Sequence, residues 1–145
     1  MEDIFRRIPH RSPFLFVDEI VEIKQESAQA SLLISPEMSF FEGHYPGNPI
    51  MPGVLLCEAV FQTGAIFLSE YMSKENALTR TEVTPVLSRI RDARFKRIVK
   101  PGDKVTLSVF LVDTIGQFFN LRGEVHKDDK VAMTISFALA LVEDS

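Results

Sequence analysis

The sequence predicts an α+β fold in which one long, buried helix is wrapped by a curved antiparallel sheet of about six strands. Three observations lead to this prediction. Two strand-like segments precede a single strong helical segment, four segments with a period of two follow it, and the chain has 145 residues, the size of one ordinary domain. We therefore expect residues 1–145 to form one domain around one core.

The first elements are a predicted hairpin and a long loop. Phe14–Lys24 alternates loosely and is rich in Val, Ile and Phe, which favours a strand, and Ser27–Ser35 follows a short polar turn as its partner. Pro36–Gly53 then contains three Gly and four Pro. A loop of this length within a compact domain is more often functional than a simple connector.

Gly53–Met72 is the one strong helical segment. It carries apolar residues on several faces, so we expect it to be buried nearly all round. Pro52 suits the first turn, where its missing N–H costs nothing. Gly64 lies in the helix interior and indicates a close approach by a neighbouring element.

After the polar segment Ser73–Thr81, apolar and polar residues alternate with a period of two. This pattern predicts four long strands: Val86–Val99, Lys104–Ile115, Phe118–Lys127 and Val131–Val142. The sequences Lys-Pro-Gly-Asp, Ile-Gly-Gln and Asp-Asp are the predicted turns between them. A single sheet around a single helix leaves strand edges bare. Pairing with a second copy of the chain is the usual remedy, so a homodimer is expected.

Composition excludes several classes of protein. The net charge is −4 and the pI is near 5.4, which disfavours nucleic-acid binding. The single Cys57 rules out an intramolecular disulfide and a multi-cysteine zinc site, and it is expected to be a small buried hydrophobe. The N-terminus lacks a signal-peptide core, and Val54–Leu68 is judged too short and too polar to span a membrane, so a cytoplasmic protein is expected.

The long loop and the start of the helix carry the candidate chemistry. His44 is flanked by Gly and Pro and can accept a proton near neutral pH, although it could instead simply tie the loop together. Glu58 lies in an apolar helix, where burial would raise its pKa and make it a proton donor, and Gln62 lies one turn later on the same face. The bare backbone of Gly53, at the positive end of the helix dipole, is a candidate donor to a developing oxyanion.

These residues lie within a segment that resembles a known family. Gly43–Gln62, GHYPGNPIMPGVLLCEAVFQ, resembles the 3-hydroxyacyl-[acyl-carrier-protein] dehydratases of type II fatty-acid synthesis, whose pattern is GHFPG, then MPG, then E-A-x-x-Q on a helix. Pro9–Leu15 with Val17-Asp18, and Ala93–Phe95 with Val99–Asp103, also match. The resemblance therefore extends in order over nearly the whole chain.

The resemblance implies a hotdog fold and an active site shared by two protomers, as a dimer or a trimer of dimers. It implies that His44 is the base at C2 and that Glu58 of the other protomer is the acid at the C3 hydroxyl. Tyr45, Phe61, Gln62 and His10 are placed where they would bind or orient substrate. The sister branch, which also isomerises the double bond, has Asp in place of Glu58, so the non-isomerising branch is favoured.

Three positions depart from the family pattern. Ser12 stands where Tyr is frequent, Phe61 where Ala is common and Arg91 where an acidic residue is common. Phe61 lies one turn from Glu58, where it would narrow or redirect an acyl tunnel. These departures bear on chain length and pathway more than on the reaction.

A cluster of basic residues stands out in this acidic chain: Arg89, Arg91, Arg94, Lys96, Arg97 and Lys100. Alternate residues of a strand share a face, so Arg89 and Arg91 are expected to point the same way. The cluster is either a solvated strand face or, as the resemblance favours, a docking patch for an acidic acyl carrier protein.

Two other functions remain open. A thioesterase on the same fold would use a carboxylate and a water, which gives the paired His44 and Glu58 no obvious purpose. A non-catalytic acyl-binding paralogue would not need them either. No metal-ligand spacing and no nucleotide-binding Gly-rich turn is visible, so no cofactor is expected.

Overall fold

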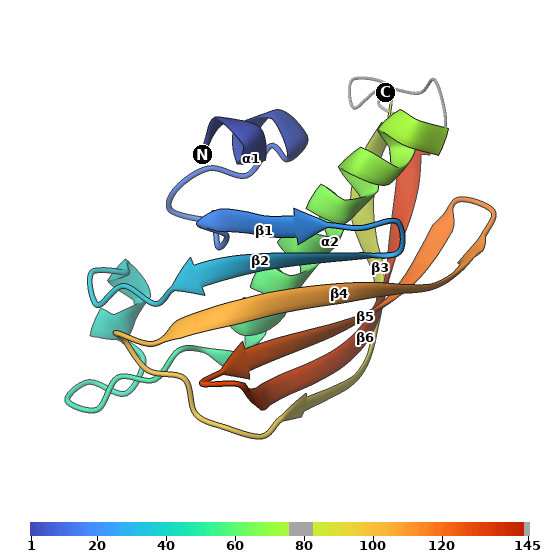
Figure 1. Ribbon diagram of the computed structural model, residues 1–145. Helices are drawn as coiled ribbons and strands as arrows, with labels where there is room; N and C mark the ends of the chain where they lie inside the picture. Colours follow the sequence, from blue (N-terminus) through green and yellow to red (C-terminus); the bar gives the residue numbers. More distant parts are fainter. Residues whose placement is uncertain (76–82, 144–145) are drawn as a thin grey trace.

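The structure, a computed structural model, describes residues 1–75 and 83–143 and confirms the predicted fold class. A curved sheet wraps around one long helix, α2, and the short α1 at the start of the chain contacts this helix (Figure 1). The elements are α1 (Glu2–Arg7), β1 (Glu19–Ile23), β2 (Ser27–Leu33), a 3-10 helix (Ser39–Glu42), α2 (Gly53–Glu75), β3 (Val83–Phe95), β4 (Lys104–Ile115), β5 (Phe118–Lys127) and β6 (Lys130–Glu143).

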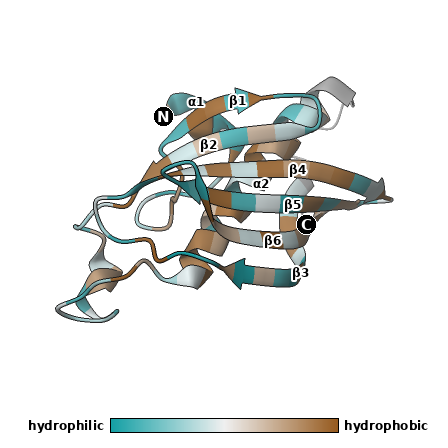
Figure 2. Cartoon of the chain, turned by 60° about the horizontal axis from the view of Figure 1, so that its bottom comes forward, coloured by the Kyte–Doolittle hydropathy of each residue, from teal (hydrophilic) through white to brown (hydrophobic). Residues whose placement is uncertain are grey.

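The sheet has six strands in the order β1-β2-β4-β5-β6-β3, and every neighbouring pair is antiparallel. Consecutive hairpins account for most of this order. The exceptions arise from β3, which follows the helix in sequence yet pairs with β6 at one edge of the sheet, so that β2 pairs directly with β4 (Figure 2). The opposite edge is β1. The position of β3 therefore leaves a strand of 13 residues at an edge.

Helix α2 is buried nearly all round, as its composition predicted. Residues 59–68 are all buried, and two glycines allow the helix and the sheet to approach closely. A Cβ on Gly64 would lie 3.1 Å from the Phe137 ring, which confirms the expected close approach. A Cβ on Gly123 of β5 would lie only 2.3 Å from Cγ1 of Val60. Glycine at both positions therefore sets how closely α2 rests on β5 and β6.

The bounds of β4 and β5 agree with the prediction, whereas the first strand does not. β1 begins at Glu19 and not at Phe14, because the Gln62 amide donates to the Phe14 carbonyl and accepts from the Phe16 N–H. This segment is therefore bound to the helix and not to a neighbouring strand. The α1 and 3-10 helices were not predicted, since each is too short to produce a periodic pattern.

Contrary to the prediction, α2 is not too short to span a membrane. The helix continues to Glu75, and its segment Gly53–Ser73 is long and apolar enough for a span by length and composition. However, 67% of this apolar stretch is buried inside the fold. Its apolar surface is covered by the sheet, so α2 is the core helix of this domain. Residues 76–82, most of the predicted polar segment after the helix, lie outside the described residues.

Candidate active site

The loop before α2 holds His44 in one orientation. The 3-10 helix Ser39–Glu42 leads into this loop, and the His44 N–H bonds to the Phe40 carbonyl at 3.1 Å. Nδ1 of the His44 ring lies 2.7 Å from the Ile50 carbonyl oxygen. A carbonyl only accepts, so Nδ1 must carry the proton, which leaves Nε2 of the neutral ring free as a base. His44 therefore ties the loop together and also presents a proton acceptor.

Tyr45 and Gly47 give the loop its sharp path. Both have positive φ, 60° and 86° respectively, and the Asn48 N–H bonds back to the Tyr45 carbonyl. The Tyr45 ring meets the His44 ring edge to face at 4.7 Å and is 60% exposed. Tyr45 thus packs beside the candidate base at the surface of the single chain.

Glu58 lies on α2, where Gln62 holds one of its oxygens. Nε2 of Gln62 donates to Oε2 of Glu58 at 3.0 Å, which confirms that the two residues share a face. Gln62 is almost fully buried, and its remaining polar groups bond to the backbone of Phe14 and Phe16. The Glu58 side chain is 23% exposed, so the expected deep burial is only partial in one chain. Its carboxylate is thus positioned at the border of the core.

The structure corrects the reason for glycine at position 53. A Cβ there would lie 2.8 Å from Cε1 of Phe95, so the space over the Gly53 Cα is filled by an aromatic ring and is not open to a ligand. The helix start itself retains donors. The Leu55 and Leu56 N–H groups bond to the Pro52 carbonyl, and no backbone acceptor is recorded among the described residues for the Gly53 N–H. That N–H remains the candidate oxyanion donor.

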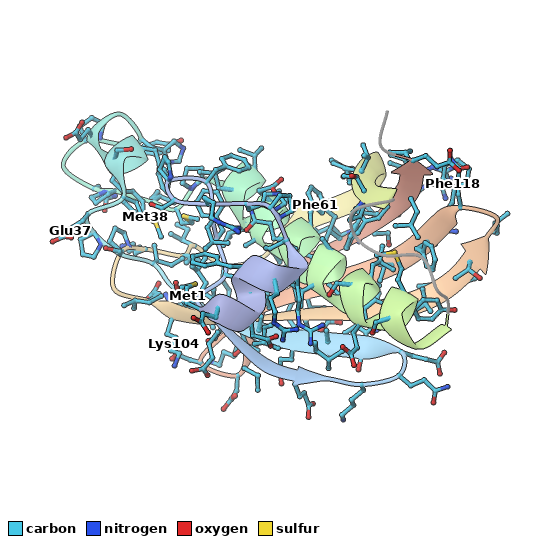
Figure 3. The ribbon with its side chains drawn as sticks, turned by 90° about the horizontal axis from the view of Figure 1, so that it is seen from above. Met1, Glu37, Met38, Phe61, Lys104 and Phe118 are labelled. Carbon is cyan, nitrogen blue, oxygen red and sulfur yellow. The ribbon has the colours of Figure 1, made fainter. Side chains whose placement is uncertain are left out.

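The other predicted site residues divide between the site and the core. His10 is brought to the site, with its Nε2 3.6 Å from Oε2 of Glu58. Phe61 (Figure 3) is 8% exposed and packs on Phe137 at 4.9 Å, so it forms part of the core against the sheet. Its effect on an acyl tunnel stays a prediction. Cys57 is buried, and burial raises the pKa of its thiol, as expected of a structural cysteine.

His44 and Glu58 do not meet within one chain. The His44 side chain contacts Ile50 and Tyr45, while that of Glu58 contacts Gln62 and His10. Among the described residues, no hydrogen bond or ion pair joins His44 to Glu58. Among residues 1–75 and 83–143, no group of three or more His, Cys, Asp or Glu is arranged to hold a metal ion.

The predicted basic cluster separates onto two surfaces. Arg89, Arg91 and Arg94 pair with Ala138, Ser136 and Thr134. These three positions alternate along β6 with Ile135, Phe137 and Leu139, which belong to the core cluster under α2. These arginines therefore lie on the sheet face turned away from α2.

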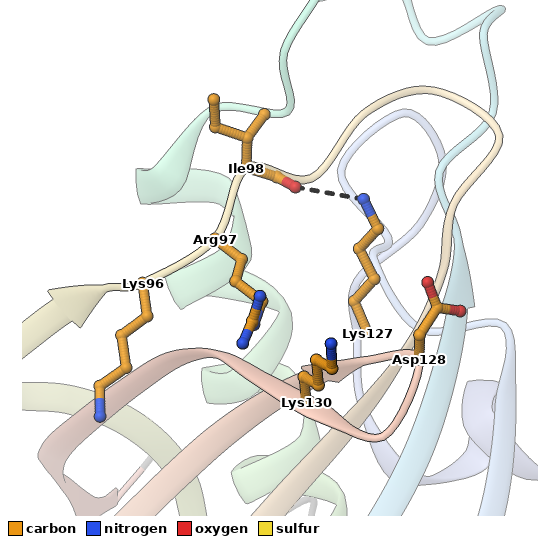
Figure 4. Close-up of a pocket in the computed structure, with 6 residues that line it drawn as sticks. All are labelled: Lys96, Arg97, Ile98, Lys127, Asp128 and Lys130. Carbon is orange, nitrogen blue, oxygen red and sulfur yellow. Dashed lines mark hydrogen bonds between the residues drawn. The ribbon is translucent and has the colours of Figure 1, made fainter.

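Two of the other basic residues of the cluster, Lys96 and Arg97 but not Lys100, line an open hollow of about 520 Å³. Its lining residues are Lys96, Arg97, Ile98, Lys127, Asp128 and Lys130 (Figure 4). Lys127 bonds to the Ile98 carbonyl at 3.3 Å and pairs with Asp103 at 2.9 Å. Lys127 and Lys130, which also line the hollow, were not among the predicted docking residues. Their charge in the turn Lys127–Lys130 was the available signal.

The fold and this arrangement define a class: a hotdog-fold protein with an imidazole on the loop before the core helix and a carboxylate on that helix. The pattern of the FabA-like domain family matches residues 8–136, and the chain belongs to that family. It is similar to the 3-hydroxyacyl-[acyl-carrier-protein] dehydratase FabZ of Caulobacter sp. (strain K31), with 37% identity over 97% of this chain and 85% of that protein. It is also 38% identical to the FabZ of Legionella pneumophila subsp. pneumophila, over 99% of this chain and 94% of that protein.

Solved structures share the fold. The dehydratase heterocomplex ApeI:P from Xenorhabdus doucetiae superimposes with a TM-score of 0.81 at 14% identity, over 96% of this chain and 90% of that chain. A hypothetical thioesterase with coenzyme A from Streptococcus pneumoniae TIGR4 superimposes with a TM-score of 0.63 at 12% identity, over 87% of this chain and 86% of that chain. At such low identity these structures establish the hotdog architecture alone.

Proposed function

We propose that the protein dehydrates (3R)-3-hydroxyacyl-[acyl-carrier-protein] to trans-2-enoyl-[acyl-carrier-protein] in fatty-acid biosynthesis. The observation that carries this proposal is the 37–38% identity, over nearly the full chain, to enzymes of that name. The pairing of an imidazole base with a carboxyl group suits the reaction, because one proton must leave C2 and another must join the departing hydroxyl.

The geometry of each group supports the proposed roles. Nε2 of His44 takes the C2 proton, and the Gly53 N–H stabilises the negative charge that develops on the thioester oxygen. Glu58 gives its proton to the C3 hydroxyl, which leaves as water while the C2–C3 double bond forms. Gln62 holds the carboxyl group in place through Oε2.

We infer that two copies of the chain build each site. β3 forms an edge of 13 residues, and its apolar side chains Leu87 and Ile90 are 39% and 51% exposed although they pair with the core residues Leu139 and Phe137. Part of the helix side of β3, at Leu87 and Ile90, is therefore left uncovered by its own α2. Val54 at the start of α2 is 75% exposed as well. A second copy paired along β3 would cover these surfaces, and further assembly into a trimer of dimers stays a prediction.

The activity is tested by mass spectrometry of 3-hydroxyacyl carrier proteins of several chain lengths after incubation with the enzyme. We expect the acyl group to lose one water while it stays attached to its carrier. Release of free acid would identify a thioesterase, and an unchanged acyl group would leave only acyl binding. Either result would contradict the proposed reaction.

The carrier protein is proposed to dock at the hollow between Lys96 and Lys130. The chain after this hollow adjoins the site, because the Val99 carbonyl accepts from the Met51 N–H directly before α2. Lys96, Arg97 and Lys130 have no ion-pair partner among the described residues, so their charge is available to an acidic protein. Such complementarity acts mainly on the rate of encounter.

We further propose that the chain works as one domain in the cytoplasm.

Reversing the charge of Lys96 and Arg97 to Glu should raise KM for carrier-linked substrate several-fold and weaken its salt dependence. Turnover of a small thioester analogue should stay unchanged, since docking charge does not move the reacting protons. The matched control reverses the charges of Arg89 and Arg91, on the other sheet face. It should change little in the KM for carrier-linked substrate or in the turnover of the thioester analogue. A larger effect from this control pair would place docking on the outer face of the sheet.

A further inference from the structure

His10 and Glu58 form a contact that the proposed proton transfers do not use. Nε2 of His10 lies 3.6 Å from Oε2 of Glu58, and the two side chains are 28% and 23% exposed. This distance is too long for a hydrogen bond in the free chain. Contacts of this kind in catalytic sites commonly tighten when substrate binds. The His10 ring also stacks on Phe14, with ring centroids 6.5 Å apart.

The surroundings of the other ring nitrogen, Nδ1, determine which tautomer of His10 is favoured. Nδ1 is buried and has no hydrogen-bond partner among the described residues. A proton on Nδ1 would leave a buried donor unsatisfied, so the neutral ring with its hydrogen on Nε2 is favoured. Burial also lowers the pKa of His10, while Glu58 raises it and Arg11 lowers it. These are the charged groups that face the ring, Glu58 from α2 and Arg11 from its own segment.

Nε2 of Gln62 and Nε2 of His10 therefore both point toward Oε2 of Glu58. Gln62 donates to Oε2 at 3.0 Å, and the bonds of its amide to Phe14 and Phe16 leave it one orientation. His10 directs Nε2 at Oε2 from the N-terminal segment. That segment is held in turn by Arg11, which bonds to the carbonyls of Phe5 and Ile8. An oxygen that faces two donors is the poorer place for a proton, so Oε1 is the better one.

We infer that His10 is a positioning residue for the general acid: as a neutral ring it directs its N–H at Oε2 of Glu58 and so keeps the reactive proton on Oε1. This inference rests on the proposed function, because it assigns a partner to the proposed acid. It adds a second positioning group to Gln62. His10 itself touches neither the substrate carbonyl nor C2 in this scheme.

The first test needs no substrate. The chain has three histidines, so comparison with His10→Phe assigns the His10 nitrogen signals in a protein labelled with ¹⁵N-histidine. We expect a neutral His10 with its hydrogen on Nε2 throughout the pH range of activity. In Glu58→Gln, the pKa of His10 should fall, because the carboxylate that raises it is gone. A hydrogen on Nδ1, or a titration unchanged by Glu58→Gln, overturns the inference.

The second test is kinetic. His10→Phe should keep the stacking on Phe14 but lower plateau kcat about tenfold, with KM little changed, because the acid is misplaced and not removed. The alkaline limb of its kcat profile should move to higher pH, since the lost N–H favoured the charged carboxylate. His10→Gln places an amide N–H near the position of Nε2 and should restore much of both.

Phe14→Leu is the matched packing control, and its alkaline limb should stay in place. A His10→Phe enzyme with wild-type kcat and an unmoved limb overturns the inference, as does a Phe14→Leu enzyme that reproduces the same shift. A wild-type enzyme that leaves 3-hydroxyacyl carrier proteins intact would instead defeat the proposed function, while the nitrogen signals of His10 would still be measured independently.

Discussion

Replacing Glu58 by glutamine should reduce dehydration by about 10²–10⁴-fold, the range typical for the loss of a general acid. Glutamine keeps the volume of the side chain and an oxygen that accepts from Gln62, so folding and assembly should survive. What is lost is the proton for the departing hydroxyl. The measurement is single-turnover conversion of 3-hydroxyacyl carrier protein at saturating enzyme, which separates the chemical step from docking.

The matched control is Glu37→Gln, which makes the same change at an exposed position of the preceding loop. It should turn over substrate at the wild-type rate. Circular dichroism and gel filtration should give the same result for both variants. A Glu58→Gln enzyme that dehydrates as fast as wild type would make Glu58 a structural residue and remove the acid from the proposed mechanism.

His44→Ala should abolish dehydration and, in the reverse direction, the exchange of deuterium into C2, because the base at that carbon is gone. Mixed in equal amounts with Glu58→Gln and allowed to exchange subunits, it should recover up to about one quarter of wild-type activity in a two-fold dimer. Half of the dimers are then mixed, and each mixed dimer contains one site in which both His44 and Glu58 are intact.

The control is a mixture of His44→Ala with His44→Asn, in which every site lacks the base. That mixture should stay inactive at any ratio. Subunit exchange is verified by mass spectrometry of the intact dimers. Verified exchange without recovered activity would mean that each chain holds its own complete site and that the shared site is wrong.

The sequence by itself determined the elements whose signals are local. The period of two and the Gly- or Asp-containing turns located β4 and β5 at their observed bounds. Pro52 marked the start of α2, and the apolar residues on several faces of that helix predicted its burial. The spacing of four residues between Glu58 and Gln62 predicted their contact, because such residues are neighbours on any helix. His44 was recognised from its loop and the family pattern.

The tertiary structure decided everything that depends on contacts between distant residues. It bound Phe14 and Phe16 to Gln62, and it filled the space over Gly53 with the ring of Phe95. It also divided the basic cluster between the outer sheet face and the hollow at Lys127. Hydrophobic period and turn chemistry report only on neighbours in the chain. Strand order, the bare edge of β3 and the contact of His10 with Glu58 arise from packing between segments that no local pattern relates.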